Sequence, residues 1–128
     1  SEVQMQSVGV DLIELWRIEA VLGRWGQNFL DKIYTINEQQ FSKRRIPQLA
    51  ARFAAKEAVM KALGTGIRGV GWREVEVTRK RGQPPFVLLH GRAKVRAERM
   101  GMEEISISLS HSKDYAIASV VMRYERNI

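Results

Sequence analysis

The sequence contains no cysteine and only two histidines, His90 and His111, among its 128 residues. The absence of cysteine excludes a disulfide framework, a zinc site built on thiolates and a cysteine nucleophile. A metal ion would therefore have to be bound by oxygen ligands or by the two histidines. No apolar run approaches the roughly 20 residues needed to cross a bilayer, and residues 1–10 lack the layout of a secretion signal. We therefore expect a cytoplasmic protein with no membrane partner.

Acidic residues are scarce relative to basic ones, because 14 Asp and Glu stand against 21 Lys and Arg, a net charge of +7. With 45% hydrophobic residues the chain can fill one core, and its length fits a single domain over residues 1–128. The charge indicates an anionic partner: a nucleic acid, a membrane surface, a phosphorylated small molecule or an acidic protein. A nucleic-acid-binding module would require aromatic residues among the basic clusters, yet only Trp72 and Phe86 lie near residues 73–81.

Hydrophobic periodicity predicts a chain of mixed strands and helices. Strands are expected at residues 3–10, 74–78, 86–89, 105–109 and 116–122, and helices at 12–25, 29–33, 37–43, 48–63 and 91–100. Thr35 followed by Glu38 is a capping box for the third helix, and Pro47 and Gly64 delimit the fourth. Because strand pairs are joined by short links, we expect an α+β fold in which an antiparallel sheet packs against the long helix.

The helix expected at 48–63 is the most informative segment about chemistry. Its buried stripe is expected to consist of Leu49, Phe53, Met60 and Leu63, and a second face of Ala50, Ala54 and Ala58. Lys56 falls within the stripe, which is unusual for a cation unless its ammonium meets an anion. Glu57 and Lys61 lie one turn apart beside the alanines. They form either a surface ion pair or a carboxylate and an ammonium directed at a ligand that approaches there.

Three further features have both a structural and a functional interpretation. Asp11 follows an apolar strand, and it either caps the helix expected from residue 12 or joins Glu57 in holding one divalent ion through carboxylate oxygens. The loop Gly64-Thr65-Gly66 either ends the long helix or approaches phosphate oxygens with its backbone N–H groups. His111 follows a strand, and it either contacts a phosphate or leaving group or bonds to neighbouring turn residues.

Three segments carry these features in one order. They are Val8 to Leu12 (VGVDL), Arg52 to Gly66 (RFAAKEAVMKALGTG), and Ser106 to His111 (SISLSH) followed by Tyr115 and Ala116. Together they strongly resemble the holo-acyl-carrier-protein synthase family, the small single-domain class of 4′-phosphopantetheinyl transferases, over about residues 7–122. The larger two-domain transferases have a second acidic residue two positions after the first aspartate, where this chain has Ile13. One departure is Gly82-Gln83-Pro84, where relatives commonly have lysine between glycine and proline.

The resemblance implies transfer of the phosphopantetheine arm of coenzyme A to a serine of an apo acyl carrier protein, of fatty-acid or polyketide type, with release of 3′,5′-ADP. Asp11 and Glu57 would ligate Mg²⁺, and Glu57 or a water on the metal would take the serine proton. Lys61 would contact the pyrophosphate. The other coenzyme-binding residues that the resemblance implies are Arg52, Lys56, Gly64, Thr65, Gly66 and His111. Of these, Arg52 and His111 would lie near the 3′-phosphate.

The resemblance also implies partners. The small class is typically a homotrimer with active sites between subunits, and no nucleic acid takes part. Because these carrier proteins are acidic and dock by a helix, the exposed side of the first helix becomes the expected docking surface. The basic residues expected there are Arg17 and Arg24, with Arg44 and Arg45 adjacent. An inactive homologue that serves as a trimeric scaffold is the remaining alternative, and the presence of both carboxylates and Lys61 argues against it.

Overall fold

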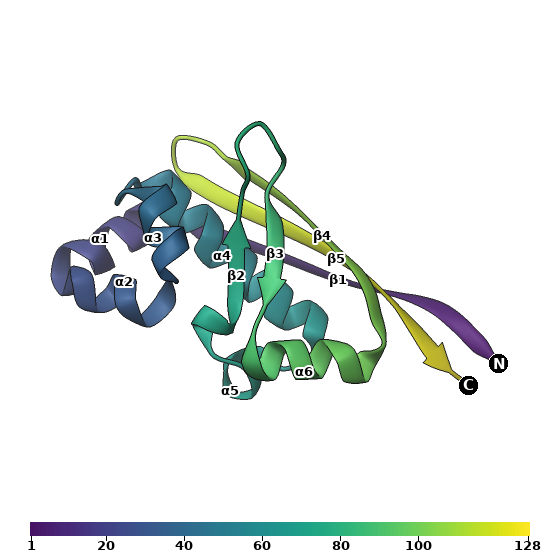
Figure 1. The fold of residues 1–128 in the computed structure, drawn as a ribbon. Coiled ribbons are helices and arrows are strands. Elements are labelled where there is room, and N and C mark those ends of the chain that lie inside the picture. The colour runs from purple at the N-terminus through teal and green to yellow at the C-terminus, as the bar shows by residue number, and fades with distance from the viewer.

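The computed structural model describes residues 1–128, and it consists of two antiparallel sheets on either side of a long helix, with shorter helices at the ends (Figure 1). The elements are β1 (Glu2–Glu14), α1 (Leu15–Trp25), α2 (Gln27–Ile33), α3 (Ile36–Ser42), α4 (Ile46–Leu63), α5 (Gly66–Gly69), the 3₁₀ turn η1 (Trp72–Glu74), β2 (Val75–Thr78), β3 (Phe86–Leu89), α6 (Gly91–Met100), β4 (Met102–His111) and β5 (Tyr115–Asn127). No helix is both long and apolar enough to span a membrane.

The larger sheet has the strand order β1-β5-β4, so the last strand of the chain lies in its centre and the first lies at one edge. In the register of β1 with β5, Gly9 is opposite Val120 and Asp11 is opposite Ala118. Side chains alternate between the two faces, so that Ala116, Ala118, Val120 and Met122 of β5 are buried. The smaller sheet pairs β2 with β3 alone.

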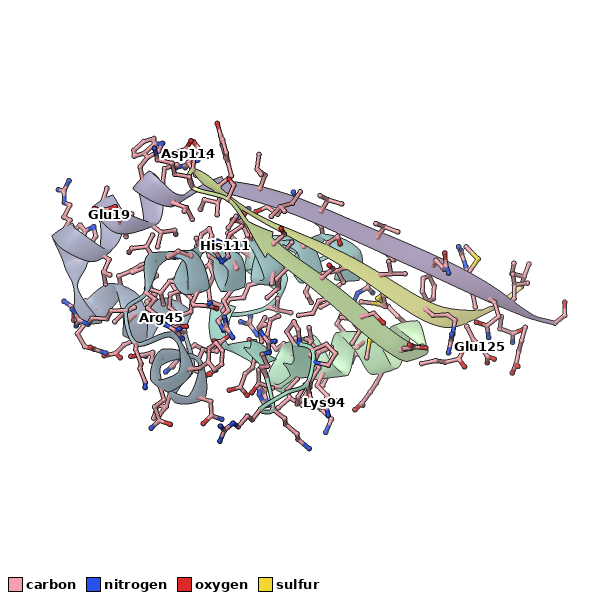
Figure 2. All side chains as sticks on the ribbon, turned by 90° about the horizontal axis from the view of Figure 1, so that it is seen from above. Glu19, Arg45, Lys94, His111, Asp114 and Glu125 are labelled. Carbon is pink, nitrogen blue, oxygen red and sulfur yellow. The ribbon has the colours of Figure 1, made fainter.

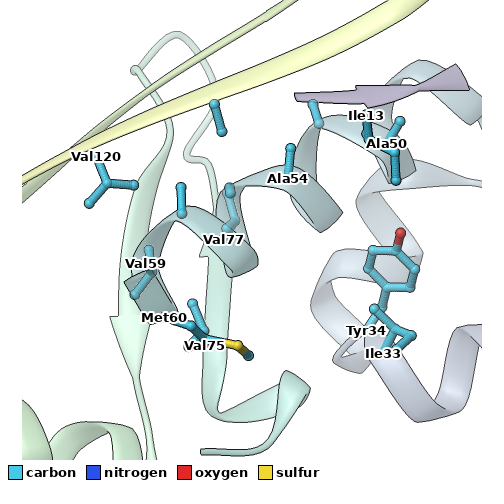
Figure 3. Packing of buried hydrophobic residues seen from close by; sticks show 14 of the residues in the cluster. Ile13, Ile33, Tyr34, Ala50, Ala54, Val59, Met60, Val75, Val77 and Val120 are labelled. Carbon is cyan, nitrogen blue, oxygen red and sulfur yellow. The ribbon is translucent and has the colours of Figure 1, made fainter. Parts of the chain in front are cut away.

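Helix α4 lies between the two sheets and is therefore buried on several sides. Figure 3 shows Ala54 directed toward the larger sheet, with Val75 and Val77 of β2 on the opposite side of the helix. Alanines let a sheet approach a helix closely, and the closest approach is at Gly9 of β1. A Cβ atom built on Gly9 would lie 2.0 Å from the Ala58 carbonyl oxygen. Ser7 adds a hydrogen bond of 2.7 Å from its Oγ to the Ala62 carbonyl oxygen.

The prediction for the first strand and helix was wrong at their junction. The strand continues past Val10 to Glu14, and α1 begins at Leu15 rather than at Leu12. The reason is that the ladder with β5 extends along the whole of β1, and only Ile13 of its last residues faces the core. Asp11 therefore lies inside a strand, and it does not cap a helix.

The other elements agree with the sequence more closely. The bounds of β3 and α6 match their predicted ranges, and the capping box is present, with Glu38 N–H donating to Thr35 Oγ1 and Thr35 N–H to Glu38 Oε1. Glu74 was expected in a strand but belongs to η1, and α5 and η1 were not predicted. The strands β4 and β5 extend beyond their predicted ranges because they pair with each other through most of their length.

Candidate active site

Asp11, Glu57 and Lys61 come together where the edge strand β1 crosses α4. The Lys61 Nζ atom donates to Asp11 Oδ1 at 2.9 Å and to the Val10 carbonyl oxygen at 3.0 Å. The Asp11 side chain is mostly covered, whereas that of Lys61 is 55% exposed. The ammonium of Lys61 thus pairs with a carboxylate 50 residues away along the chain. It remains accessible from solvent, where it can meet an anionic ligand.

The Glu57 carboxyl is partly buried beside Asp11, and its pKa is raised to about 7. Loss of hydration is the largest cause, followed by the charge of Asp11 and a hydrogen bond between the two carboxyl groups, whereas Lys61 and Arg17 lower the pKa. Two carboxyls this close repel each other when both are ionised. They share a proton or attract a cation, and a pKa near neutrality suits a group that accepts a proton during a reaction.

The pair fits a divalent ion that binds through oxygen. The chain holds no cluster of three or more His, Cys, Asp or Glu side chains that could bind a metal. Ile13, two residues after Asp11, is buried against the core, so no third carboxylate joins the pair from this strand. Mg²⁺ is commonly bound by one or two carboxylates, with water and substrate phosphates as its other ligands. Asp11 and Glu57 provide that partial set beside a cation, Lys61, which suits a phosphate-bearing substrate.

Lys56 lies inside the protein, away from this site, and its expected contact with the coenzyme stays a prediction. Its side chain is completely buried, and Nζ donates to Glu38 Oε1 at 2.7 Å and to the carbonyl oxygens of Trp72 and Val75. All three ammonium protons are therefore used inside the protein. Burial lowers the pKa of Lys56 and the Glu38 carboxylate opposes that shift. The residue holds α4 against α3 and β2, and it is a structural ion pair.

Arg52 and His111 line a cavity of about 440 Å³ beside β4, at the edge of the larger sheet opposite β1. Arg52 donates from Nη1 to Gln48 Oε1 at 3.0 Å, and its guanidinium lies 4.3 Å from the centre of the Phe41 ring. Its Nε atom is buried without a partner. Figure 2 shows His111 at the end of β4 above α4. A cavity that offers an unpaired guanidinium N–H and an imidazole suits a phosphate group.

Arg79 is a third basic residue in this cavity, and the sequence analysis assigned it no role. Burial is the largest cause that lowers the pKa of Arg52, and the charges of Arg45 and Arg79 act in the same direction. Arg79 Nε donates to the Gln83 carbonyl oxygen at 2.8 Å across the β2–β3 turn, which holds the side chain toward the cavity. Pro84 and Pro85 of the same turn form part of the wall, and no carboxylate lines it. The signal available in the sequence was only the basic turn itself.

The two groups of residues lie at opposite edges of the larger sheet. Asp11 belongs to β1 and His111 to β4, with β5 between them. Two strand spacings separate the edge strands by about 10 Å. A single chain therefore presents two separate groups of residues, which we name half-sites: one with the carboxylate pair and Lys61, and one with Arg52, Arg79 and His111.

The loop after α4 ends the helix, as one of its two interpretations expected. Gly64 has a left-handed backbone conformation (φ 72°), and its N–H bonds to the Lys61 carbonyl oxygen. The Thr65 N–H bonds to the Met60 carbonyl oxygen, and Gly66 begins α5. The loop follows Lys61 by one turn, and its approach to phosphate stays a prediction.

An apolar cavity of about 530 Å³ opens beside α1 and α2. Its lining includes Arg17, Val21 and Trp25 of α1 and Phe53 of α4, one turn before Glu57. Arg24 stacks over the Trp25 ring at 5.1 Å. The exposed side of α1 thus combines two arginines with an apolar recess close to the carboxylate pair, an arrangement suited to an acidic surface that also presents an apolar side chain.

Arg44 and Arg45, the other residues expected at this surface, differ in their surroundings. Arg44 is exposed, and its Nη2 donates to Gln27 Oε1 at the start of α2, so it lies next to the end of α1. Arg45 donates from Nη2 and Nε to the carbonyl oxygens of Phe41 and Ser42. It therefore satisfies the carboxyl end of α3, whereas Arg44 contacts α2, and both side chains are exposed.

Comparisons with known proteins show which family the chain belongs to. The family model described as "4′-phosphopantetheinyl transferase superfamily" matches residues 7–120. The chain is 45% identical to the holo-[acyl-carrier-protein] synthase of Gloeobacter violaceus over 120 residues, which are 91% of each chain. It is 46% identical to that of Herpetosiphon aurantiacus, covering 91% of this chain and 98% of the other. The solved Helicobacter pylori holo-[acyl-carrier-protein] synthase in complex with coenzyme A superposes with a TM-score of 0.82 at 28% identity, over 90% of this chain and 98% of that one.

Proposed function

Because the chain belongs to the 4′-phosphopantetheinyl transferase superfamily, we propose that Asp11, Glu57 and Lys61 form the site of its transfer reaction. The chain is a holo-[acyl-carrier-protein] synthase, which moves the phosphopantetheine arm of coenzyme A to an apo acyl carrier protein. The observation that carries the proposed site is the contact of the Lys61 ammonium with Asp11, beside a Glu57 carboxyl whose pKa is about 7.

In this reaction a serine hydroxyl oxygen of the carrier protein attacks the phosphorus that bears the pantetheine arm. A new phosphorus–oxygen bond forms, the phosphoanhydride bond breaks, and 3′,5′-ADP leaves with the bonding electrons. Glu57 accepts the serine proton, for which its raised pKa is well matched. Lys61 moves from Asp11 to the pyrophosphate and stabilises the charge on its oxygens. Mg²⁺ held by Asp11 and Glu57 would add Lewis-acid stabilisation of the same oxygens.

We assign the 3′-phosphate of the coenzyme to the cavity of Arg52, Arg79 and His111. Three basic side chains and no carboxylate line its wall, and the buried Nε of Arg52 has no hydrogen-bond partner within the chain. Arg79 adds a third basic residue to Arg52 and His111, the two residues expected near the 3′-phosphate from the sequence. The loop at Gly64, Thr65 and Gly66 lies one turn beyond Lys61, which supports its approach to the pyrophosphate.

The separation of the two half-sites supports a homotrimer in which each active site lies between subunits. The outer face of the larger sheet carries exposed apolar residues, among them Val8, Val10 and Leu12 of β1 and Ile117 and Val121 of β5. Such a continuous apolar face needs a cover, and a second copy of this chain also brings the missing half-site. The cytoplasmic location stays a prediction from the sequence.

Val121→Glu is expected to dissociate this trimer, because it places a carboxylate in the centre of the apolar face. Sedimentation equilibrium should find three times the 14.7 kDa chain mass for the unmodified chain and a smaller assembly for the variant. Ile36→Glu is the matched control, since Ile36 is also an exposed β-branched apolar residue but lies on α3, away from the sheet. An unmodified chain that is monomeric at assay concentration contradicts the shared active site.

Carrier-protein docking on α1 is expected to depend on Arg24. Arg24→Glu should raise the apparent KM for the carrier protein roughly tenfold, because a like charge now faces an acidic partner, and leave the KM for coenzyme A nearly unchanged. Reversing Arg17 as well should enlarge the effect. The single variant is the cleaner one, because Arg17 also lowers the pKa of Glu57 and its reversal disturbs the chemistry.

Steady-state kinetics measure the Michaelis constants for the carrier protein and for coenzyme A. Lys94→Glu on α6 makes the same charge change at a different end of the molecule, as Figure 2 shows by the positions of Lys94 and Glu19. Equal changes in the two Michaelis constants of the Arg24 variant, or an equal effect of the Lys94 variant, would contradict docking on α1.

The transfer itself is tested by mass spectrometry of an apo carrier protein incubated with the chain, coenzyme A and Mg²⁺. The carrier should gain the mass of one phosphopantetheine group, and removal of divalent ions with a chelator should stop the gain. Transfer at an unchanged rate without divalent ions would refute the proposed role of Asp11 and Glu57 as metal ligands, while leaving the transferase activity in place.

A further inference from the structure

A third cavity, of about 650 Å³, lies between the loop after α4 and helix α6, and apart from Thr65 none of its lining residues belongs to the site proposed for the transfer reaction. One face of α6 lines it with Arg92, Arg96 and Arg99, which recur at the three- and four-residue spacing of a helix. Thr65 forms the opposite wall, and no carboxylate lines the cavity. Three guanidinium groups thus face one recess.

Only one of these three arginines is neutralised by a carboxylate. Arg92 pairs with Glu74 at 3.0 Å, and the same carboxylate also accepts backbone N–H bonds from Gly71, Arg92 and Ala93. Both oxygens of Glu74 therefore accept hydrogen bonds. Loss of hydration raises the pKa of Glu74, but these bonds together outweigh it and hold the pKa below the usual value. Arg96 donates from Nε to the Leu63 carbonyl oxygen at 2.9 Å, a neutral acceptor. Arg96 and Arg99 therefore bring two positive charges that no carboxylate of the cavity balances.

The opposite wall presents a buried hydroxyl without a partner. The Oγ1 atom of Thr65 is inaccessible to solvent and makes no hydrogen bond, although Thr65 stands at the position that would cap α5. Gly69 and Gly91 have no side chains, so the backbone at these two positions lies close to Thr65 and to Glu74. A Cβ at residue 69 would lie 2.7 Å from the Thr65 Cβ, and one at residue 91 would lie 2.6 Å from Glu74 Oε2. An orphaned hydroxyl opposite unbalanced guanidinium groups indicates an absent acceptor.

We propose that this cavity, which we name the α6 recess, is a second anion site that takes a phosphate group through Arg96, Arg99 and Thr65. Guanidinium groups bind phosphate oxygens in pairs of charge-assisted hydrogen bonds, and a phosphate oxygen also accepts the hydroxyl proton of a threonine. The phosphate comes either from the inorganic ion or from a phosphomonoester such as 3′,5′-ADP. The site is separate from the cavity of Arg52, with which it shares no residue.

The α6 recess is connected to the helix that carries Glu57 and Lys61. Arg96 bonds to the last turn of α4 at Leu63, and Thr65 follows the Gly64 that ends the helix. An anion that engages the free Nη atoms of Arg96 keeps that bond in place and adds a link across the loop. Occupancy is therefore expected to stabilise the carboxyl end of α4 and α5, whether or not the transfer proceeds.

The test is a titration of the ¹⁵N-labelled chain with inorganic phosphate, followed by the amide signals of Gly69 and Gly91 and the Nε–H signal of Arg99. These signals should shift and saturate. Arg99→Gln should weaken the binding by roughly fivefold, the effect of losing one charge-assisted contact at an open site. Lys94→Gln, which removes the same charge from a solvent-facing position of α6, should change it less than about twofold.

Two further experiments identify the source of the phosphate group and distinguish the α6 recess from the cavity of Arg52. Titration with 3′,5′-ADP that moves the same signals at lower concentration assigns the recess to a phosphomonoester, whereas an effect of inorganic phosphate alone assigns it to the free ion. In Arg52→Ala, the signals of the α6 recess should respond as before. Loss of the response in Arg52→Ala, equal effects of the Arg99 and Lys94 variants, or no saturable shift would overturn the proposal. None of these results depends on the transfer assay.

Discussion

Glu57→Gln is expected to lower kcat/KM for the transfer by about a thousandfold, the loss typical of removing a general base that also carries charge at a metal site. Glutamine keeps the volume of the side chain but neither accepts the serine proton nor carries the negative charge that a divalent ion requires. The transfer is measured by mass spectrometry of the carrier protein. Glu98→Gln, the same change on α6, is the control and should retain full activity.

The stability of the Glu57→Gln variant should not fall with its activity. A measurement of stability therefore distinguishes a catalytic loss from a folding defect. The pKa of Glu57 rises from 4.5 to about 7 in the folded chain, through burial and then through Asp11. A carboxyl with a raised pKa favours the folded state fully below pH 4.5, and that contribution is lost as the pH rises through about 7. Glutamine has no such loss, so the metal-free variant should be at least as stable as the unmodified chain at pH 8. An active variant, or one that is inactive only because it unfolds, would contradict the assignment.

Gly9→Ala is expected to cost at least about 2 kcal/mol of unfolding free energy, because an added methyl group overpacks a rigid contact between backbones. The new Cβ would lie 2.0 Å from the Ala58 carbonyl oxygen, and no side-chain rotation relieves this contact. β1 must move away from α4 instead. The same movement carries Asp11, two residues further along the strand, away from Glu57, so activity should fall together with stability.

Gly23→Ala is the matched control for this variant. Gly23 lies within α1, and a Cβ there meets no atom within 4 Å. Alanine in a helix interior is favoured over glycine by about 0.5–1 kcal/mol, so this variant should be slightly more stable. Urea denaturation monitored by circular dichroism measures both. A Gly9 variant as stable as the Gly23 variant would show that the approach of β1 to α4 is not tight.

Local sequence patterns predicted the elements that depend on neighbouring residues. The strand Phe86–Leu89 and the helix Gly91–Met100 have the expected bounds, and Thr35 and Glu38 form the expected capping box. These features depend on hydrogen bonds and side chains a few residues apart, which a sequence displays directly. The first strand was misjudged because its last residues pair with β5, more than 100 residues away. No local pattern reports such a pairing.

The same distinction between local patterns and long-range contacts applies to the candidate site. The spacing of Glu57 and Lys61 on one helix and the acidic Asp11 after an apolar strand were visible in the sequence, and these three side chains meet in the structure. Lys56 was placed on a buried stripe correctly, but its partners Glu38, Trp72 and Val75 come from other elements. Only their convergence shows that Lys56 is a structural ion pair.

The sequence by itself determined the family, the antiparallel α+β class and the chemistry of oxygen ligands, because motif order, periodicity and the lack of cysteine are properties of the chain alone. The tertiary structure decided what each charged residue faces. It buried Lys56, turned Arg79 toward Arg52 and His111, and put the carboxylate pair and the basic cavity at opposite edges of one sheet. The physical reason is that hydration and charge–charge distances, which set the pKa of Glu57 and the accessibility of each arginine, exist only after distant segments pack together.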